Sequence, residues 1–347
     1  MFDLKIRGIN RRIFSSLTIS NMKKKILKNL VGKKIVVLKG GRSSEREISL
    51  KTGKNIENAL EKSGLKVVGL DLSPEQNFNV VIEKLKKIKP DICFIALHGS
   101  PGEDGTIQAV LELLKVPYTG SGVLSSALSL NKKFSKIIFE KFNIPTPKWF
   151  SVKDSLVSTT FLQKMALAKD FDFPLVVKPT SQGSTIGVSI VKNQKELKDA
   201  KILAFKYDKE IMIEQYIKGK EITVGILEQK PLPPMEIVPR ISAFYDYKAK
   251  YTKDGSKHII PAPLPKHLLR KIQNLGLLSH QVLGCECFSR VDMRLGENGK
   301  IFVLEVNTIP GMTEISLLPD AARFIGIDFP EMILRILNYT LKKCNGS

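Results

Sequence analysis

Apolar residues in the first third of the chain occur in short continuous runs separated by helical spacings, which predicts strands alternating with helices. Residues 34–39 contain an apolar run that ends at Gly40 and Gly41, typical of a buried parallel strand entering a tight turn. Capping-type side chains and early acids at 43–47 indicate the start of a helix. The same alternation predicts strands at 66–70 and 91–97 and helices at 80–87 and 107–114. Short links between these elements predict a doubly wound α/β domain over residues 33–121.

The pattern changes after residue 122, where longer helical stretches and shorter strands predict two α+β units. The first, residues 122–213, has helices at 123–130 and 132–142 and strands at 174–178 and 187–191. The second, residues 214–347, is entered through a strand-like segment at 211–217 that spans its first boundary, and a further strand-like segment lies at 221–227. It continues through a long loop at 233–265, a helix at 267–283, strands at 287–295 and 301–306, and a closing helix at 329–341.

Residues 1–32 form a basic extension without strand alternation or Gly and Pro punctuation, and we predict that it is disordered. It lacks the compact apolar segment and small-residue cleavage site of a signal peptide. Met22 stands directly before three lysines and is an alternative start of translation. A weakly amphipathic arm that contacts a membrane or an acidic partner is the other interpretation.

The composition is that of a globular chain, with 347 residues of which 43% are apolar and 26% charged. It excludes a fibre, a disordered chain and a small disulfide scaffold. No run approaches the roughly 18 apolar residues that a membrane helix needs, so we expect no stable membrane insertion. The four cysteines lack the paired spacing of a zinc site, and we interpret them as reduced thiols of a cytoplasmic protein.

The net charge of +21 suggests nucleic-acid binding, but the kind of base argues against it. Of the 55 basic residues 44 are lysine, whereas the bidentate recognition of phosphate and guanine belongs to arginine. Residues 1–34 alone carry ten bases and one acid. We therefore attribute the charge to a solvated lysine-rich surface and a basic tail, with no nucleic-acid partner.

Two glycine-rich loops carry candidate chemistry. The loop at 97–105 places His98, Glu103 and Asp104 directly after a buried strand, where α/β enzymes position working groups; an ordinary turn capped by Asp104 is the alternative. The loop at 181–187 follows Lys178, and its small residues allow backbone N–H groups to close on phosphate oxygens. It is not a Walker loop, because its lysine precedes the glycines.

Hard oxygen ligands gather near the C-terminus. Asp292 lies on one predicted strand and Glu305 and Asn307 on the next, so alternate residues of neighbouring strands place the three on one face. Such a set without His or Cys favours Mg²⁺ shared with nucleotide phosphates over zinc. The alternative is a solvated hairpin with a cross-strand Arg290–Glu305 pair.

Together these motifs resemble the D-alanine–D-alanine ligases of the ATP-grasp superfamily. The resemblance runs in order from about residue 33 to the C-terminus through six segments: 40–49, 96–105, 117–122, 178–187, 245–251 and 305–313. It implies an ATP-grasp architecture, in which an N-terminal α/β domain precedes two α+β domains that clasp ATP. It also implies a homodimer and ATP as co-substrate, with two Mg²⁺ ions, for which Mn²⁺ can substitute.

The resemblance also assigns roles to residues. It implies metal ligation by Asp292, Glu305 and Asn307, and ATP binding by Lys132, Lys178, Gly183, Thr185, Glu214, Tyr216, Ile217, Glu221 and Lys250. It implies substrate binding by His98, Ser316 and Leu317. The catalytic set is Glu45, Ser184, Tyr251, Arg290 and Gly311: Arg290 and the Gly311 N–H form an oxyanion hole, Glu45 holds the first ammonium, and Ser184 and Tyr251 complete a hydrogen-bonded network.

The implied reaction joins two D-alanine molecules through an acyl phosphate, releasing ADP and phosphate, and supplies a peptidoglycan precursor. Asn131 stands where the family pattern has an aspartate, and Ile315 replaces a polar residue of some members. Tyr251 favours dipeptide synthesis, since the resemblance suggests a histidine there in ligases that make a D-lactate ester. A different ATP-grasp ligase, against which the motif at 245–251 argues, and a non-catalytic nucleotide- or nucleic-acid-binding protein are the alternatives.

Overall fold

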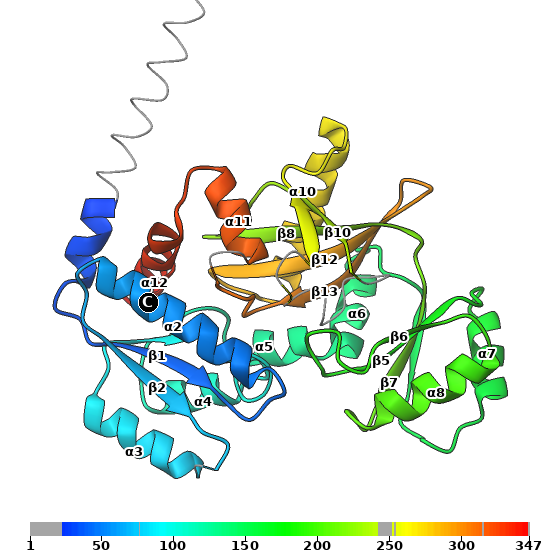
Figure 1. The fold of residues 1–347 in the computed structure, drawn as a ribbon, viewed down its shortest axis with the longest axis horizontal. Helices are drawn as coiled ribbons and strands as arrows, with labels where there is room; N and C mark the ends of the chain where they lie inside the picture. The colour runs from blue at the N-terminus through cyan, green and yellow to red at the C-terminus, as the bar shows by residue number, and fades with distance from the viewer. Residues whose placement is uncertain (1–22, 76, 242–251, 253–254, 314–315, 346–347) are drawn as a thin grey trace, which may run out of the picture.

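The computed structural model describes residues 23–75, 77–241, 252, 255–313 and 316–345, whose strands form three sheets with helices against them (Figure 1). The first sheet is parallel, in the order β2-β1-β3. Its strands are β1 (Ile35–Gly40), β2 (Val67–Leu72) and β3 (Ile92–Ile95), which alternate with the helices α2 (Arg46–Lys62), α3 (Phe78–Ile88) and α4 (Thr106–Leu113).

The central strand β1 is buried on both faces, as expected for a doubly wound domain. Ile35 and Val37 pack in one core with residues of α2, whereas Val36 and Leu38 pack in another with residues of α3 and α4. Alternate side chains of a strand point to opposite faces, so the continuous apolar run gives each helical layer its own core. The predicted doubly wound arrangement is confirmed.

A glycine at the end of β1 brings α2 into place. Gly40 has φ +84°, and a Cβ there would lie 2.0 Å from Asp71 Oδ1. Its N–H donates to Ser49 Oγ at 2.8 Å, and Arg46 in the first turn of α2 forms two hydrogen bonds with the Asp71 carboxylate, at 2.8 and 2.7 Å. The start of α2 is therefore fixed beside the carboxyl end of the sheet, where α/β folds bind ligands.

The second unit contains the helices α5 (Val123–Leu130) and α6 (Lys132–Lys141) and an antiparallel sheet in the order β4-β7-β5-β6. The strands are β4 (Trp149–Val152), β5 (Leu175–Pro179), β6 (Ser189–Val191) and β7 (Ile211–Gln215). Helices α7 (Thr159–Leu167) and α8 (Gln194–Phe205) share a core with this sheet. The sequence pattern predicted β5, β6 and β7 but not β4, α7 or α8. Its assignment of β7 to the third unit is wrong, because β7 pairs with β4 and β5 in this sheet.

The third sheet has the order β11-β10-β8-β12-β13, with β9 paired to β8. Its strands are β8 (Gly219–Leu227), β9 (Lys230–Pro231), β10 (Met235–Pro239), β11 (Ser256–Ile259), β12 (Phe288–Gly296) and β13 (Ile301–Asn307). The helices α10 (Lys266–Val282), α11 (Leu317–Phe324) and α12 (Phe329–Asn345) follow or separate them. The prediction of one loop at 233–265 is wrong, because β10 and β11 pair with each other inside it.

The prediction that residues 1–32 are an unpacked extension is wrong for residues 23–30, which form a helix. Ile26 and Leu30 are 4% and 0% exposed and belong to the core formed by β1, α2 and α12. Asn29 donates to Asn338 of α12 at 3.1 Å. The apolar spacing was hidden among lysines, which remain at the surface while Ile26 and Leu30 face inward. Residues 1–22 lie outside the described part.

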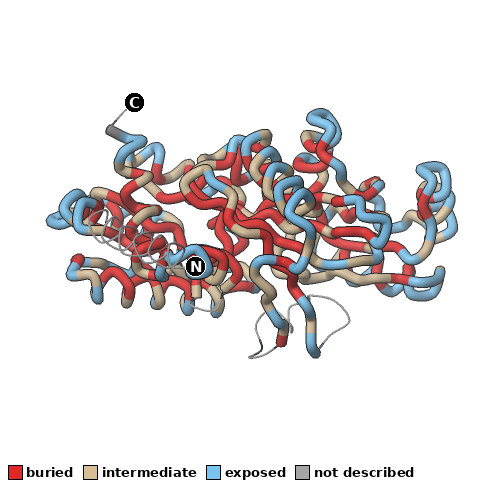
Figure 2. The backbone as a smooth tube through the Cα atoms, turned by 90° about the horizontal axis from the view of Figure 1, so that it is seen from above, coloured by how far each residue is buried: buried red, intermediate tan, exposed pale blue. Residues whose placement is uncertain are grey.

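Buried residues lie along the middle of the molecule, and exposed residues gather on its outer coils and turns (Figure 2). Among the described helices, none has the length and apolar character needed to cross a membrane.

Candidate active site

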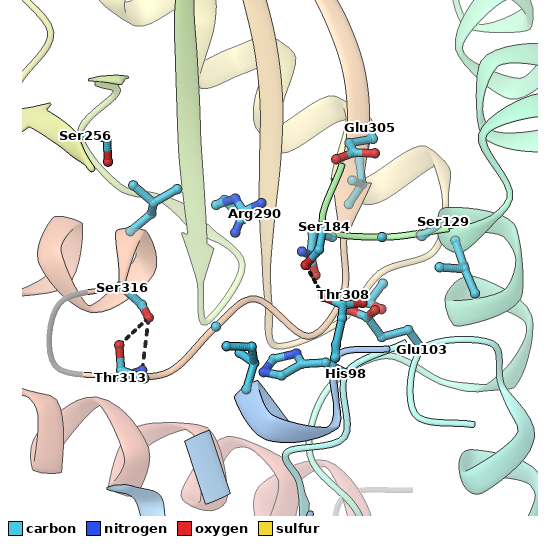
Figure 3. Close-up of a pocket in the computed structure, with 18 of the residues that line it drawn as sticks. His98, Glu103, Ser129, Ser184, Ser256, Arg290, Glu305, Thr308, Thr313 and Ser316 are labelled. Carbon is cyan, nitrogen blue, oxygen red and sulfur yellow. Dashed lines mark hydrogen bonds between the residues drawn. The ribbon is translucent and has the colours of Figure 1, made fainter. Parts of the chain in front are cut away.

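Two cavities lie between the units, the smaller between the second and third, and they share Lys132 and Glu305 in their walls. The larger, about 650 Å³, is lined by residues of all three units (Figure 3). These include Glu45, His98, Glu103, Gly183, Ser184, Arg290, Asn307, Gly311, Ser316 and Leu317. The smaller, about 140 Å³, has apolar side chains beside lysines and acids, including Val176, Lys178, Thr185, Ile190, Glu214, Tyr216, Ile217, Glu221, Asp292 and Leu304. The structure thus brings together the predicted site residues that it describes.

The glycine-rich loop after β5 reaches Glu45, the residue that precedes α2. The Ser184 hydroxyl donates to Glu45 Oε1. A Cβ at Gly183 would lie 2.8 Å from Glu45 Oε2, so the close approach needs a glycine there. Ser184 and Thr185 have φ +49° and +64°, left-handed conformations that side chains rarely adopt. The loop is thereby held across the larger cavity against the first unit.

His98 follows β3 and is 4% exposed. Its Nε2 lies 3.1 Å from Thr52 Oγ1 of α2, and its carbonyl oxygen accepts a hydrogen bond from Ser43 Oγ at 2.6 Å. Burial lowers the pKa of His98, although the Glu45 carboxylate acts in the opposite direction. The imidazole is therefore neutral at physiological pH and serves as a hydrogen-bonding group.

Glu103 is a site residue that the sequence analysis noted in its loop but did not select. It is 7% exposed, and its Oε2 accepts from the Gly99 N–H at 2.9 Å. Burial raises the pKa of Glu103 to about 8, and the charge of Glu45 adds to this rise. An acid between glycines directly after a buried strand was the signal that could have identified it.

Arg290 is held rigidly by Asp292 on the same strand. Its Nε and Nη2 donate to the two carboxylate oxygens of Asp292 at 2.9 and 2.7 Å, and Thr223 Oγ1 donates to Oδ1 at 2.7 Å. In the β12–β13 register Asp292 stands opposite Glu305, and Arg290 stands opposite Asn307. This register, with Asn307 two residues beyond Glu305, places Asp292, Glu305 and Asn307 on one face of the two strands.

The donors at this end of β12 and β13 fit a hard divalent cation. They comprise two carboxylates and the amide oxygen of Asn307, which also accepts from the Ile309 N–H at 3.1 Å. The Glu305 side chain is 29% exposed and lines both cavities, so its oxygens are accessible to a ligand. Oxygen-only donors of this kind suit Mg²⁺ bound together with phosphates.

Lys132 stands at the start of α6 between the cavities. Its Nζ lies 3.2 Å from Glu305 Oε2 and donates to the Gln182 carbonyl oxygen at 2.7 Å. The preceding Asn131 caps α6, since its side chain accepts from the backbone N–H groups of Lys133 and Phe134 at 3.2 and 3.3 Å. An amide oxygen suffices for this capping role, so the departure from aspartate does not disturb the position of Lys132.

Glu214 lies between two lysines in the smaller cavity. Lys178 Nζ donates to its oxygens at 2.9 and 3.0 Å, and Lys136 Nζ lies 2.6 Å from Oε2. Burial alone would raise the pKa of Glu214, but the two lysines outweigh it and lower that pKa. Burial lowers the pKa of Lys136 to about 8, against the attraction of Glu214. Lys136, which is 0% exposed, was missed because a helical lysine usually indicates a surface.

Arg294 organises the rim of the smaller cavity and was also missed. Its guanidinium lies 5.8 Å from the centre of the Tyr216 ring, its Nε donates to the Ile217 carbonyl oxygen at 3.2 Å, and its Nη1 lies 3.4 Å from Glu221 Oε2. One arginine thus orders three predicted ATP-binding residues.

The turn before α11 forms the far wall of the larger cavity. Ser316 Oγ accepts from the Thr313 N–H at 3.0 Å and lies 2.8 Å from Thr313 Oγ1 (Figure 3). A Cβ at Gly311 would lie 3.2 Å from Ser316 Oγ, and Leu317 is the first residue of α11. Three further residues of the sequence analysis, Lys250, Tyr251 and Ile315, lie outside the described residues.

Comparisons with known proteins agree with this geometry. The family models described as D-ala D-ala ligase C-terminus and D-ala D-ala ligase N-terminus match residues 138–338 and 80–121. The chain is 47% identical over 308 residues to a D-alanine–D-alanine ligase of Geotalea uraniireducens, covering 88% of this chain and 94% of that protein.

Solved structures of D-alanine–D-alanine ligases are also similar to this chain. A D-alanine–D-alanine ligase of Bacillus anthracis superimposes with a TM-score of 0.79 at 37% identity, covering 91% of this chain and 99% of that one. The same enzyme complexed with ATP gives a TM-score of 0.77 at 35% identity, with the same coverage.

Proposed function

The chain belongs to the D-alanine–D-alanine ligase family of ATP-grasp enzymes and joins two D-alanine molecules at the expense of ATP for cell-wall synthesis, and we propose that the residues around the two cavities divide this reaction between them. The observation that carries the assignment of roles is the Lys132–Glu305 pair shared by both cavities. A nucleotide in the smaller cavity would direct its phosphates past this pair toward substrates in the larger one.

ATP binds in the smaller cavity. Apolar side chains such as Val176, Ile190 and Leu304 suit the faces of an adenine ring. The backbone at Tyr216 and Ile217 offers hydrogen bonds to the base edge, while Glu221 is available for the ribose hydroxyls. Lys178 is directed by Glu214, and the Gly183–Thr185 part of the loop supplies backbone N–H groups, so both reach the phosphates.

The first D-alanine binds with its ammonium at Glu45, beside His98. Its carboxylate oxygen attacks the γ-phosphorus of ATP, the bond to the β-phosphate oxygen breaks, and an acyl phosphate and ADP result. Lys132, Lys178 and Lys250 stabilise the charge that spreads over the transferring group.

Two Mg²⁺ ions, for which Mn²⁺ can substitute, would be held by Asp292, Glu305 and Asn307. When bound, they neutralise charge on the phosphate oxygens.

The second D-alanine binds with its carboxylate at Ser316 and Leu317. Its neutral amine attacks the acyl carbonyl carbon, phosphate leaves, and the nitrogen loses a proton. Arg290 and the Gly311 N–H stabilise the oxyanion. The two hydrogen bonds from Arg290 to Asp292 support this role, because they fix the guanidinium before charge develops.

The Ser184–Glu45 contact, completed by Tyr251, closes the loop over the larger cavity and excludes water from the acyl phosphate. We further propose that the enzyme acts in the cytoplasm as a homodimer. The proposed functional units are residues 33–121, 122–213 and 214–347, and β7, which spans the second boundary, pairs within the second sheet.

Phosphate release from ATP tests this function, with D-alanine, L-alanine, D-serine and D-lactate offered in turn and the products identified by mass spectrometry. We expect D-alanyl-D-alanine and stoichiometric phosphate with D-alanine. Release that another amine supports and D-alanine does not would contradict the proposal.

A further inference from the structure

A His–Asp pair joins the strand β11 to the helix α11 on the wall of the larger cavity. His258 Nδ1 lies 2.8 Å from Asp320 Oδ2, and both residues line the cavity together with Ser316 and Leu317. The two elements are far apart in sequence, since β11 is an edge strand of the third sheet and α11 follows the last strand of that sheet. Neither residue belongs to the groups proposed to bind the substrates or ATP.

The pair is sheltered and its two side chains are oriented by further contacts. The side chains of His258 and Asp320 are 20% and 18% exposed. On the other side of the imidazole, His258 Nε2 lies 3.3 Å from Ser256 Oγ, and Asp320 Oδ1 accepts from Arg323 Nη1 at 2.7 Å. Partial burial and oriented partners make such a contact stronger than an exposed ion pair.

Asp320 is coupled directly to the turn that carries Ser316. Its backbone N–H donates to the Ser316 carbonyl oxygen at 2.9 Å, in the first turn of α11. The contact of the Asp320 side chain with His258 therefore restrains the position of Ser316 relative to the third sheet. Arg323 contacts the same carboxylate from within α11, so its contact adds no restraint between the two elements.

We propose that the His258–Asp320 pair positions the second-substrate subsite: it fixes the first turn of α11 against β11 and so sets the apparent affinity for the second D-alanine. This inference rests on the proposed binding of that carboxylate at Ser316. Neither side chain acts on the reacting atoms, so both are positioning residues.

The test compares His258→Ala, Asp320→Ala and Asp320→Asn with Arg323→Ala as the matched control. Phosphate release over a wide range of D-alanine concentrations separates the Michaelis constants of the two D-alanine sites, and the KM for ATP and kcat are measured at saturation. Hydrogen exchange of a peptide spanning Leu317–Phe324 reports on α11 independently of the reaction.

Both alanine variants are expected to raise the KM of the second D-alanine about fivefold or more and to speed exchange in α11. The first D-alanine KM, the ATP KM and kcat should stay within about twofold. Asp320→Asn, which keeps an acceptor for His258, and Arg323→Ala should remain near wild type.

Unchanged second-site KM in both alanine variants, an equal rise in Arg323→Ala, or a parallel change in all kinetic constants would overturn the proposal. Wild-type enzyme that releases no phosphate with D-alanine would instead overturn the proposed function, and the exchange measurement would still report whether the pair restrains α11.

Discussion

Lys132 Nζ lies 3.2 Å from Glu305 Oε2, and this pair belongs to the walls of both cavities. The lysine comes from α6 in the second unit and the glutamate from β13 in the third. A pair of opposite charges contributed by two units therefore borders both cavities.

Replacing Glu305 with Gln is expected to reduce turnover at least about 100-fold while preserving the fold. The amide removes one negative ligand for Mg²⁺ and the ionic partner of Lys132. Phosphate release measures the activity, and circular dichroism with thermal unfolding checks the fold. Glu297→Gln is the matched control, because Glu297 is exposed and its Oε1 lies 3.1 Å from Nζ of Lys218, another surface residue. Near-normal turnover at ordinary Mg²⁺ would remove Glu305 from the metal site.

Truncation should distinguish the two parts of the N-terminal segment. A chain that starts at Met22 keeps the helix at 23–30 and is expected to unfold near the wild-type Tm. A chain that starts at Lys33 loses Ile26 and Leu30 from the core and should unfold several degrees lower.

The single substitution Leu30→Ala should cost about 2–5 kcal/mol of unfolding free energy. The adjacent Val31→Ala is its control, because Val31 is 67% exposed. Equal unfolding temperatures for chains starting at Met22 and Lys33 would show that the helix contributes nothing to stability.

His280 should make the protein sensitive to acid. It is 0% exposed, its Nδ1 lies 2.7 Å from Ser289 Oγ, and burial lowers its pKa to about 4 from the ordinary 6.5. Between these two pH values the unfolded chain binds a proton that the folded chain does not. The free energy of unfolding therefore falls as the pH drops from about 6.5 to 4, by about 3 kcal/mol from this group.

Denaturant unfolding of His280→Gln across pH 4 to 8 tests this dependence. Between pH 6.5 and 4 the free energy of unfolding of the variant should fall less than that of the wild type, whatever the stability of the variant at neutral pH. His267→Gln, at an exposed position of the same helix, should retain the wild-type slope. An identical slope in wild type and His280→Gln would show that His280 is not the group responsible.

Tyr251→His should add ester synthesis below about pH 6.5, the unperturbed pKa of histidine. An imidazolium attracts the carboxylate of a hydroxy acid and repels the ammonium of an amino acid, whereas a tyrosine hydroxyl is neutral. The assay supplies equal D-alanine and D-lactate from pH 5.5 to 8.5 and identifies the products. Tyr251→Phe is the control that lacks a titrating group, and substantial ester from wild type at neutral pH would contradict the reasoning.

Structure was predicted correctly from the sequence where a local pattern was compatible with a single arrangement. The apolar run of β1 required burial on both faces, and the alternation around Asp292 and Glu305 required a common face. β10 was missed because prolines precede and end it, and proline usually indicates a loop or a strand end. The strand is fixed by its pairing with β8 and β11, which no local pattern reports.

In the candidate site, too, local sequence patterns did not reveal residues whose roles depend on contacts distant in sequence. Lys136 lies among other helical lysines, and its burial is explained by contacts with Glu214, on a distant strand, and with Thr146 Oγ1 and the Pro147 carbonyl oxygen. Arg294 and Thr223 likewise have roles that come from neighbouring strands. Motifs identified the groups that we propose to touch ligands, whereas the residues that orient those groups become visible only in three dimensions.

The packing of α12 affects how the chain folds during synthesis. Met332, Ile336 and Leu337 complete the core that lies against β1 and α2, and Asn29 and Asn338, which hydrogen-bond, are 309 positions apart. A ribosome releases the N-terminal strands long before the helix that covers one face of their sheet. The first unit therefore cannot complete its core during translation, and an exposed apolar face persists until the last residues emerge. Chains interrupted before α12 should consequently be prone to aggregate.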